Sequence, residues 1–98
     1  PSAAWENTGM TARSITLYVR PSCDLCSDAR AAIARIVRET PTMLTFDEVD
    51  IESDPELHRR FLADIPVVEY RGHLLPHATS RLRIEAFLGR IDDGVLSV

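Results

Sequence analysis

Two cysteines, Cys23 and Cys26, stand where one periodic pattern of the chain gives way to another. Residues 15–19 alternate aliphatic side chains with threonine and tyrosine, which is typical of a β-strand. Residues 23–39 place apolar side chains at the spacing of an α-helix. Two cysteines in the first turn of a helix have Cα atoms about 5 Å apart, inside the range of roughly 4.4–6.8 Å that a disulfide tolerates. The pair can therefore close as a disulfide and reopen with little movement of the backbone.

The position of Cys23 at the start of the predicted helix favours redox chemistry. Unpaired N–H groups and the positive end of the helix dipole stabilise a thiolate, so we expect the pKa of Cys23 to lie below its ordinary value of about 8.5. The thiolate is the form that attacks a disulfide, and Cys26 lies further into the helix. Cys23 and Cys26 are therefore the predicted catalytic residues. A metal site or a purely structural pair would use the same side chains, and both stay open as alternatives.

The size and charge of the chain narrow the class of protein. Ninety-eight residues form one small domain, and a formal net charge of −4 provides no basic surface for nucleic acid. Two cysteines are too few for the disulfide framework of a small secreted protein. The apolar runs are too short to span a bilayer, and residues 1–13 lack the apolar segment of a signal peptide. We therefore expect a monomeric cytoplasmic protein that has no nucleic-acid or membrane partner.

The remaining patterns predict an α/β fold in which helices flank a four-stranded mixed sheet, in the order β-α-β-α-β-β-α. Strands are expected at residues 15–19, 43–51, 67–70 and 73–75, and helices at residues 23–39, 55–63 and from residue 81 to Gly89 or Gly94. The first two strands should be parallel because a helix connects them. The last two should form a hairpin around Arg71 and Gly72. The predicted domain spans residues 14–92, between a flexible N-terminal extension at residues 1–13 and a C-terminal tail at residues 93–98.

Some side chains have expected places within these elements. Ser53 and Glu56 have the spacing of a capping box at the start of the second helix, and Thr79 or Ser80 is expected to cap the third. The face of the first helix that is expected to be buried carries Leu25, Ala29, Ile33, Ile36 and Val37.

The chain resembles the glutaredoxins, within the thioredoxin-like fold. The resemblance rests on residues 17–26 (Leu-Tyr-Val-Arg-Pro-Ser-Cys-Asp-Leu-Cys), 49–51 (Val-Asp-Ile), 54–56 (Asp-Pro-Glu) and 64–67 (Asp-Ile-Pro-Val). It extends over about residues 14–90. The Cys-x-Leu-Cys form, in place of the usual Cys-Pro-Tyr-Cys, is similar to a family of short bacterial glutaredoxin-like proteins of uncharacterised function.

The resemblance implies that the Ile65–Pro66 peptide bond is cis and lies beside the cysteines, with Ile65 offering backbone groups to an extended substrate. Arg20 is the third residue expected to bind substrate; its charge would lower the pKa of Cys23, whereas Asp24 would raise it. Glutaredoxins carry a Gly-Gly and an aspartate that hold the γ-glutamyl end of glutathione. Residues 72–80 contain one glycine and no acid, so this part of glutathione recognition is not expected here.

These observations predict a dithiol–disulfide oxidoreductase of glutaredoxin-like type. Its substrate would be a protein or small-molecule disulfide, and its reductant glutathione or a thioredoxin-reductase-type enzyme, with no tightly bound cofactor. One alternative is a metal or iron–sulfur module. His73 and His77 could complete a zinc set, but they lie far along the chain from the cysteines, and Pro76 prevents a regular helix there. The other alternative is a redox-inactive domain that binds a peptide at Ile65 and Pro66.

Overall fold

The fold is organised around β1 (Arg13–Val19), an inner strand of a four-stranded sheet of order β2-β1-β3-β4. A computed structural model describes residues 13–40 and 43–97, and the side chains of residues 13–40 and 43–93. On one side β1 pairs in parallel with β2 (Leu44–Asp50), and on the other it pairs antiparallel with β3 (Val67–Tyr70). The edge strand β4 (His73–Leu75) completes a hairpin with β3. The predicted mixed sheet is confirmed.

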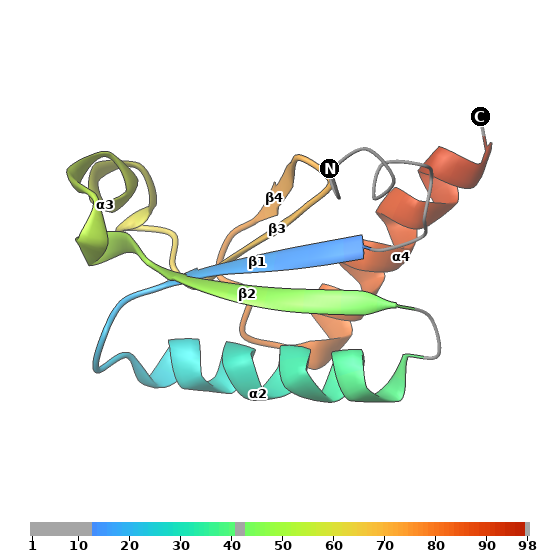
Figure 1. The fold of residues 1–98 in the computed structure, drawn as a ribbon, viewed down its shortest axis with the longest axis horizontal. Helices are drawn as coiled ribbons and strands as arrows, with labels where there is room; N and C mark the ends of the chain where they lie inside the picture. Colours follow the sequence, from blue (N-terminus) through green and yellow to red (C-terminus); the bar gives the residue numbers. More distant parts are fainter. Residues whose placement is uncertain (1–12, 41–42, 98) are drawn as a thin grey trace, which may run out of the picture.

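Helices connect these strands in the predicted order. The helices are α2 (Asp24–Glu39), α3 (Pro55–Phe61) and α4 (Arg81–Ser97), with a short 3-10 turn η1 (Ile51–Ser53) after β2. Figure 1 shows α2 running along one face of the sheet and α3 on the opposite side, near the carboxyl ends of β1 and β2. None of the described helices combines the length and the apolar character needed to cross a bilayer.

The alternation along β1 divides the core into two clusters. Ile15, Leu17 and Val19 are buried with side chains from α2 and α4. The intervening Tyr18 packs on the other face with Ile51, Phe61 and Val67. Successive side chains of a strand point to opposite faces, so a strand with bulky groups on both faces belongs inside the sheet. The larger cluster is completed by Cys26, Ala29, Ile33 and Ile36 of α2 and by Ile84, Phe87 and Leu88 of α4.

The structure corrects two expectations about helix faces and caps. Leu25 was expected on the buried face of α2, but 54% of its surface is exposed. The buried stripe of this helix begins at Cys26, and adjacent helical residues point about 100° apart. Ser53 was expected to cap α3, but Asp54 takes that place and accepts a hydrogen bond from the Glu56 N–H.

The first strand and the last helix extend beyond their predicted bounds. Arg13, assigned to a flexible extension, is the first residue of β1 and pairs with Leu44; residues 1–12 lie outside the described residues. The last helix does not end at Gly89 or Gly94 but continues to Ser97, through most of the predicted tail. A helical glycine costs only about 1 kcal/mol. Asp92 adds a tertiary contact that favours continuation of the helix past Gly89, since its carboxylate accepts a hydrogen bond from the Tyr70 hydroxyl at 2.8 Å.

Tyr18, which packs with the second cluster, has a raised pKa. Tyr18 stacks on Phe61 with ring centroids 4.5 Å apart, and its hydroxyl donates a hydrogen bond to Glu69 at 2.6 Å. Burial, assisted by this hydrogen bond and by the negative charge of Glu69, raises the pKa of Tyr18 to about 12. The neutral phenol is therefore the form that the folded state favours.

This shift predicts a loss of stability in strongly alkaline solution. An unfolded chain ionises tyrosine at a pKa of about 10. Between pH 10 and 12 the folded state keeps a proton that the unfolded state has lost, so the free energy of unfolding falls as the pH rises. Urea denaturation across this range should show the decline, and Tyr18→Phe should make it shallower. An equally steep decline in Tyr18→Phe would assign the effect to other groups.

Candidate redox site

A short loop at the carboxyl end of β1 leads to the first cysteine, Cys23. After Val19 the chain passes through Arg20, Pro21 and Ser22 before α2 begins. Ser22 adopts a left-handed φ of 58°, and Cys23 returns to extended backbone with φ −116° as the N-cap of α2. The loop therefore places the side chain of Cys23 at the amino end of a 16-residue helix.

Cys23 makes the contacts of a helix N-cap with its sulfur. Its Sγ accepts a hydrogen bond from the Cys26 N–H at 3.2 Å, and its carbonyl oxygen accepts one from the Ser27 N–H at 3.1 Å. Cys23, and not the preceding Ser22, is thus the N-cap of α2. A sulfur in this position faces the helix N–H groups that stabilise negative charge.

The two cysteines are joined in a disulfide, with their Cα atoms 5.2 Å apart. This agrees with the separation expected for two positions in one helical turn. Their exposures differ: Cys26 is fully buried in the main core cluster, whereas Cys23 is only partly buried against it. The sulfur of Cys23 is thus the more accessible of the two.

The Ile65–Pro66 peptide lies at the same end of the sheet, and it is cis, as the resemblance implied. The antiparallel register pairs Tyr18 with Val67, so the residues after Tyr18 and those before Val67 share one sheet end. Cys23 and Ile65 both pack against the main core cluster. The Ala78 N–H donates to the Pro66 carbonyl at 2.8 Å, which ties the loop before α4 to the site. No sequence pattern predicted this contact between Ala78 and Pro66.

One of the backbone groups of Ile65 that were expected to be offered to a substrate is already hydrogen-bonded within the domain. The Ile65 N–H donates to the carbonyl of Phe61 at 3.1 Å, at the end of α3. A substrate strand would therefore have to displace this bond to use the N–H.

Comparison with known proteins agrees with this geometry. A family model described as a glutaredoxin-like domain matches residues 14–91, most of the chain. The chain belongs to this glutaredoxin-like family. The crystal structure of a structural genomics target protein from X. campestris is similar at 30% sequence identity and a TM-score of 0.65, covering 78% of this chain and 96% of that one.

A second solved structure, of a malarial protein, has a TM-score of 0.64 at 13% identity and covers 81% of this chain and 96% of that one. At this identity the likeness concerns the fold alone, which is thioredoxin-like in these neighbours. A search of curated proteins finds no significant match.

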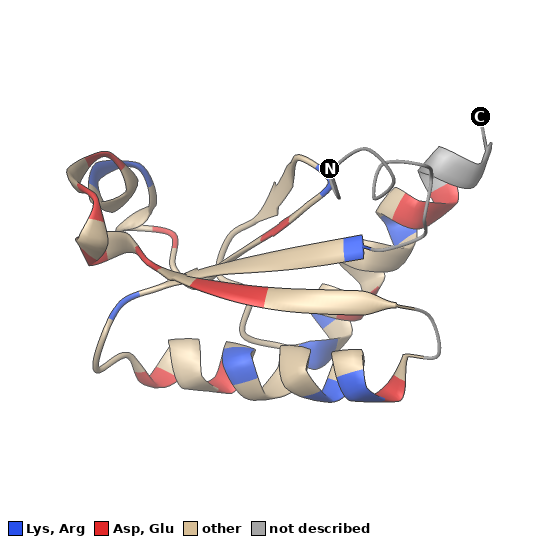
Figure 2. Cartoon of the chain, in the orientation of Figure 1, with Lys and Arg blue, Asp and Glu red and all other residues tan. Residues whose placement is uncertain are grey.

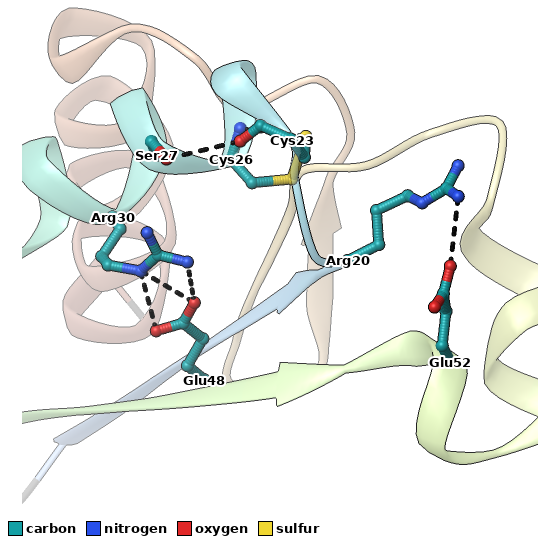
Figure 3. The surroundings of a disulfide bond; sticks show 7 residues. All are labelled: Arg20, Cys23, Cys26, Ser27, Arg30, Glu48 and Glu52. Carbon is teal, nitrogen blue, oxygen red and sulfur yellow. Dashed lines mark hydrogen bonds and ion pairs between the residues drawn. A yellow bond between two sulfur atoms is a disulfide. The ribbon is translucent and has the colours of Figure 1, made fainter.

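In this glutaredoxin-like domain, Arg20 has a partner that the sequence did not indicate. Its Nη2 lies 3.1 Å from a carboxylate oxygen of Glu52, in η1. Figure 3 shows the Arg20 side chain extending from the loop before Cys23 toward Glu52 and away from the sulfur atoms. Arg20 therefore does not act on Cys23 as an isolated positive charge. Arg20 and Glu52 lie far apart in the sequence, and no motif links them.

The histidines of the glutaredoxin-like domain do not gather at the cysteines. His73 is exposed on β4, and Nε2 of the exposed His77 lies 4.0 Å from an Asp64 carboxylate oxygen. Within the described part of the chain, no group of three or more His, Cys, Asp or Glu side chains is arranged to hold a metal ion. The two cysteines and the Ile65–Pro66 loop remain the chemically distinctive features of this end of the sheet.

Proposed function

We propose that this glutaredoxin-like domain is a thiol–disulfide oxidoreductase that reduces protein or small-molecule disulfides with the dithiol of Cys23 and Cys26. The observation that carries the proposal is the asymmetry of the pair at the start of α2. Cys23 is partly exposed and its sulfur faces the Cys26 N–H, whereas Cys26 is fully buried one turn along. An attacking thiolate and a protected resolving thiol need this arrangement.

The proposed cycle transfers two electrons to the substrate. The Cys23 thiolate attacks one sulfur of the substrate disulfide, forms a mixed disulfide and expels the other substrate sulfur as a thiolate. Cys26 then loses its proton to solvent and attacks Cys23, which releases the second substrate sulfur and closes the Cys23–Cys26 disulfide. The two substrate thiolates take up protons from water. The domain ends oxidised and the substrate ends as two thiols.

A reductant must then reopen the disulfide. We propose glutathione or a thioredoxin-reductase-type enzyme for this step. We also propose that the domain works as a monomer in the cytoplasm, without a tightly bound cofactor. With glutathione, two molecules supply the two electrons and leave as oxidised glutathione. With a reductase, the electrons come from its own dithiol. Arg20, Ile65 and Pro66 are the proposed contacts for the substrate, on account of their shared position at the carboxyl end of β1.

An insulin-reduction assay tests the proposal. The purified protein should accelerate precipitation of the insulin B chain with either glutathione, glutathione reductase and NADPH, or thioredoxin reductase and NADPH. The reduction potential of the pair, equilibrated against glutathione buffers, would show whether it works as a reductant. Absence of turnover with both donors, together with stoichiometric zinc or an iron–sulfur absorption spectrum, would replace this function with metal binding.

A further inference from the structure

The ion pair between Arg20 and Glu52 places opposite charges at the end of the sheet that carries the cysteines. The two side chains are 44% and 40% exposed, so both can meet a substrate that approaches Cys23. Glu52 is the first-turn acid of η1, which follows β2 directly. Because β2 is parallel to β1, the residue after each strand arrives at the same sheet end. The fold, and not the local sequence, thus sets a carboxylate against the cation of the active-site loop.

Two further acidic side chains lie at this end of the sheet. Asp24 follows Cys23 directly and is exposed in the first turn of α2. Asp64 directly precedes Ile65 and is about half exposed. In Figure 2 acidic segments predominate along the start of α2 and the stretch that joins β2 to α3, and a basic segment lies in the loop between β1 and α2. Once Glu52 offsets Arg20, an approaching anion meets the carboxylates of Asp24 and of Asp64, the latter 4.0 Å from Nε2 of His77.

We propose that Glu52 is a specificity-determining residue that directs this site toward neutral or cationic disulfides and away from anionic ones such as oxidised glutathione. The inference rests on the proposed function and names its substrate class. A substrate carboxylate must compete with Glu52 for the Arg20 guanidinium, whereas an ammonium group gains from the surrounding acids. Exposed ion pairs contribute little to stability, so Glu52 can be neutralised without loss of the fold.

Three small disulfides of different charge test this specificity. The reduced protein is mixed with oxidised glutathione, which is anionic, with bis(2-hydroxyethyl) disulfide, which is neutral, or with cystamine, which is cationic. The second-order rate constant for oxidation of the dithiol is measured for each. A change in the reactivity of Cys23 itself multiplies all three rate constants alike. The ratio of the glutathione rate to the cystamine rate therefore isolates the effect of substrate charge from that of thiol reactivity.

Glu52→Gln should raise this ratio about fivefold at low ionic strength, because one charge several ångströms away changes each rate about two- to threefold in opposite directions. The effect should fade in concentrated salt. Arg20→Gln should lower the ratio. The matched control is Glu39→Gln, which breaks the ion pair of Glu39 with Arg81 at the other end of α2. That position is about 24 Å along the helix from Cys23, and the ratio should not change.

The outcomes separate the two proposals. A Glu52→Gln ratio equal to the wild-type ratio, or a Glu39→Gln shift of the same size, would overturn the specificity assignment while leaving the oxidoreductase intact. Failure of all three disulfides to oxidise the wild-type dithiol would overturn the oxidoreductase proposal and, with it, the substrate class.

Discussion

Cys23→Ser is expected to abolish disulfide reduction. A serine hydroxyl stays protonated near neutrality and cannot form the mixed disulfide on which the cycle depends. Cys26 is fully buried, so its sulfur is not accessible to a substrate disulfide and cannot take over the role of Cys23. Insulin reduction by the variant should fall to the rate of the uncatalysed reaction. Full activity in Cys23→Ser would refute the mechanism.

Cys26→Ser is the matched control, because it makes the same atomic change one helical turn away. This variant keeps the attacking thiolate but cannot resolve the mixed disulfide. Incubated with a protein disulfide in the absence of glutathione, it should accumulate a covalent adduct through Cys23, visible by non-reducing electrophoresis and mass spectrometry. An adduct on Cys23→Ser and none on Cys26→Ser would reverse the assigned roles.

Leu17→Ala is expected to lower the free energy of unfolding by about 3 kcal/mol. Leu17 is fully buried in an inner strand, where it pairs with Glu48 of β2 and Val68 of β3. Truncation removes apolar contacts with the main core cluster and leaves a cavity that the flanking strands cannot close. Domains of this size have a total stability of about 5–15 kcal/mol, so the loss is a large share. The melting temperature should fall by roughly 15 °C.

Leu82→Ala provides the same chemical change at a position that is 77% exposed on α4. It removes little buried area and introduces a better helix former, so its effect on the free energy of unfolding should stay within about 0.5 kcal/mol. Urea denaturation of both variants gives the comparison. Equal losses in the two variants would show that burial of Leu17 does not account for the stability of the sheet.

The redox pair and the element order were predictable because they depend on short-range geometry. The Cys-x-x-Cys spacing at the start of a helix keeps Cys23 and Cys26 close whatever surrounds them, and their Cα atoms lie 5.2 Å apart. A helix between two strands favours a parallel pair, which β1 and β2 form. The cis bond at Ile65–Pro66 was expected from the family resemblance alone, since X–Pro bonds are cis in only about 5–6% of cases.

The predictions that failed depended on contacts between elements. The helical periodicity predicted that Leu25 is buried, but α2 is oriented against the sheet so that its first buried residue is Cys26. Glycines predicted the end of α4, but the contact of Asp92 with Tyr70 lies beyond Gly89. Propensity is worth about 1 kcal/mol at such positions, and one tertiary interaction is enough to outweigh it.

The sequence by itself determined the pair of sulfurs, the helix that begins at them and the alternation that buries both faces of β1, because each arises from neighbours along the chain. Only the tertiary structure decided which charges face the site. Parallel pairing of β1 with β2 brings Glu52 to Arg20, and the return of the chain after β4 brings the Ala78 N–H to the Pro66 carbonyl. These contacts join residues that are distant in sequence, so they exist only once the sheet has assembled.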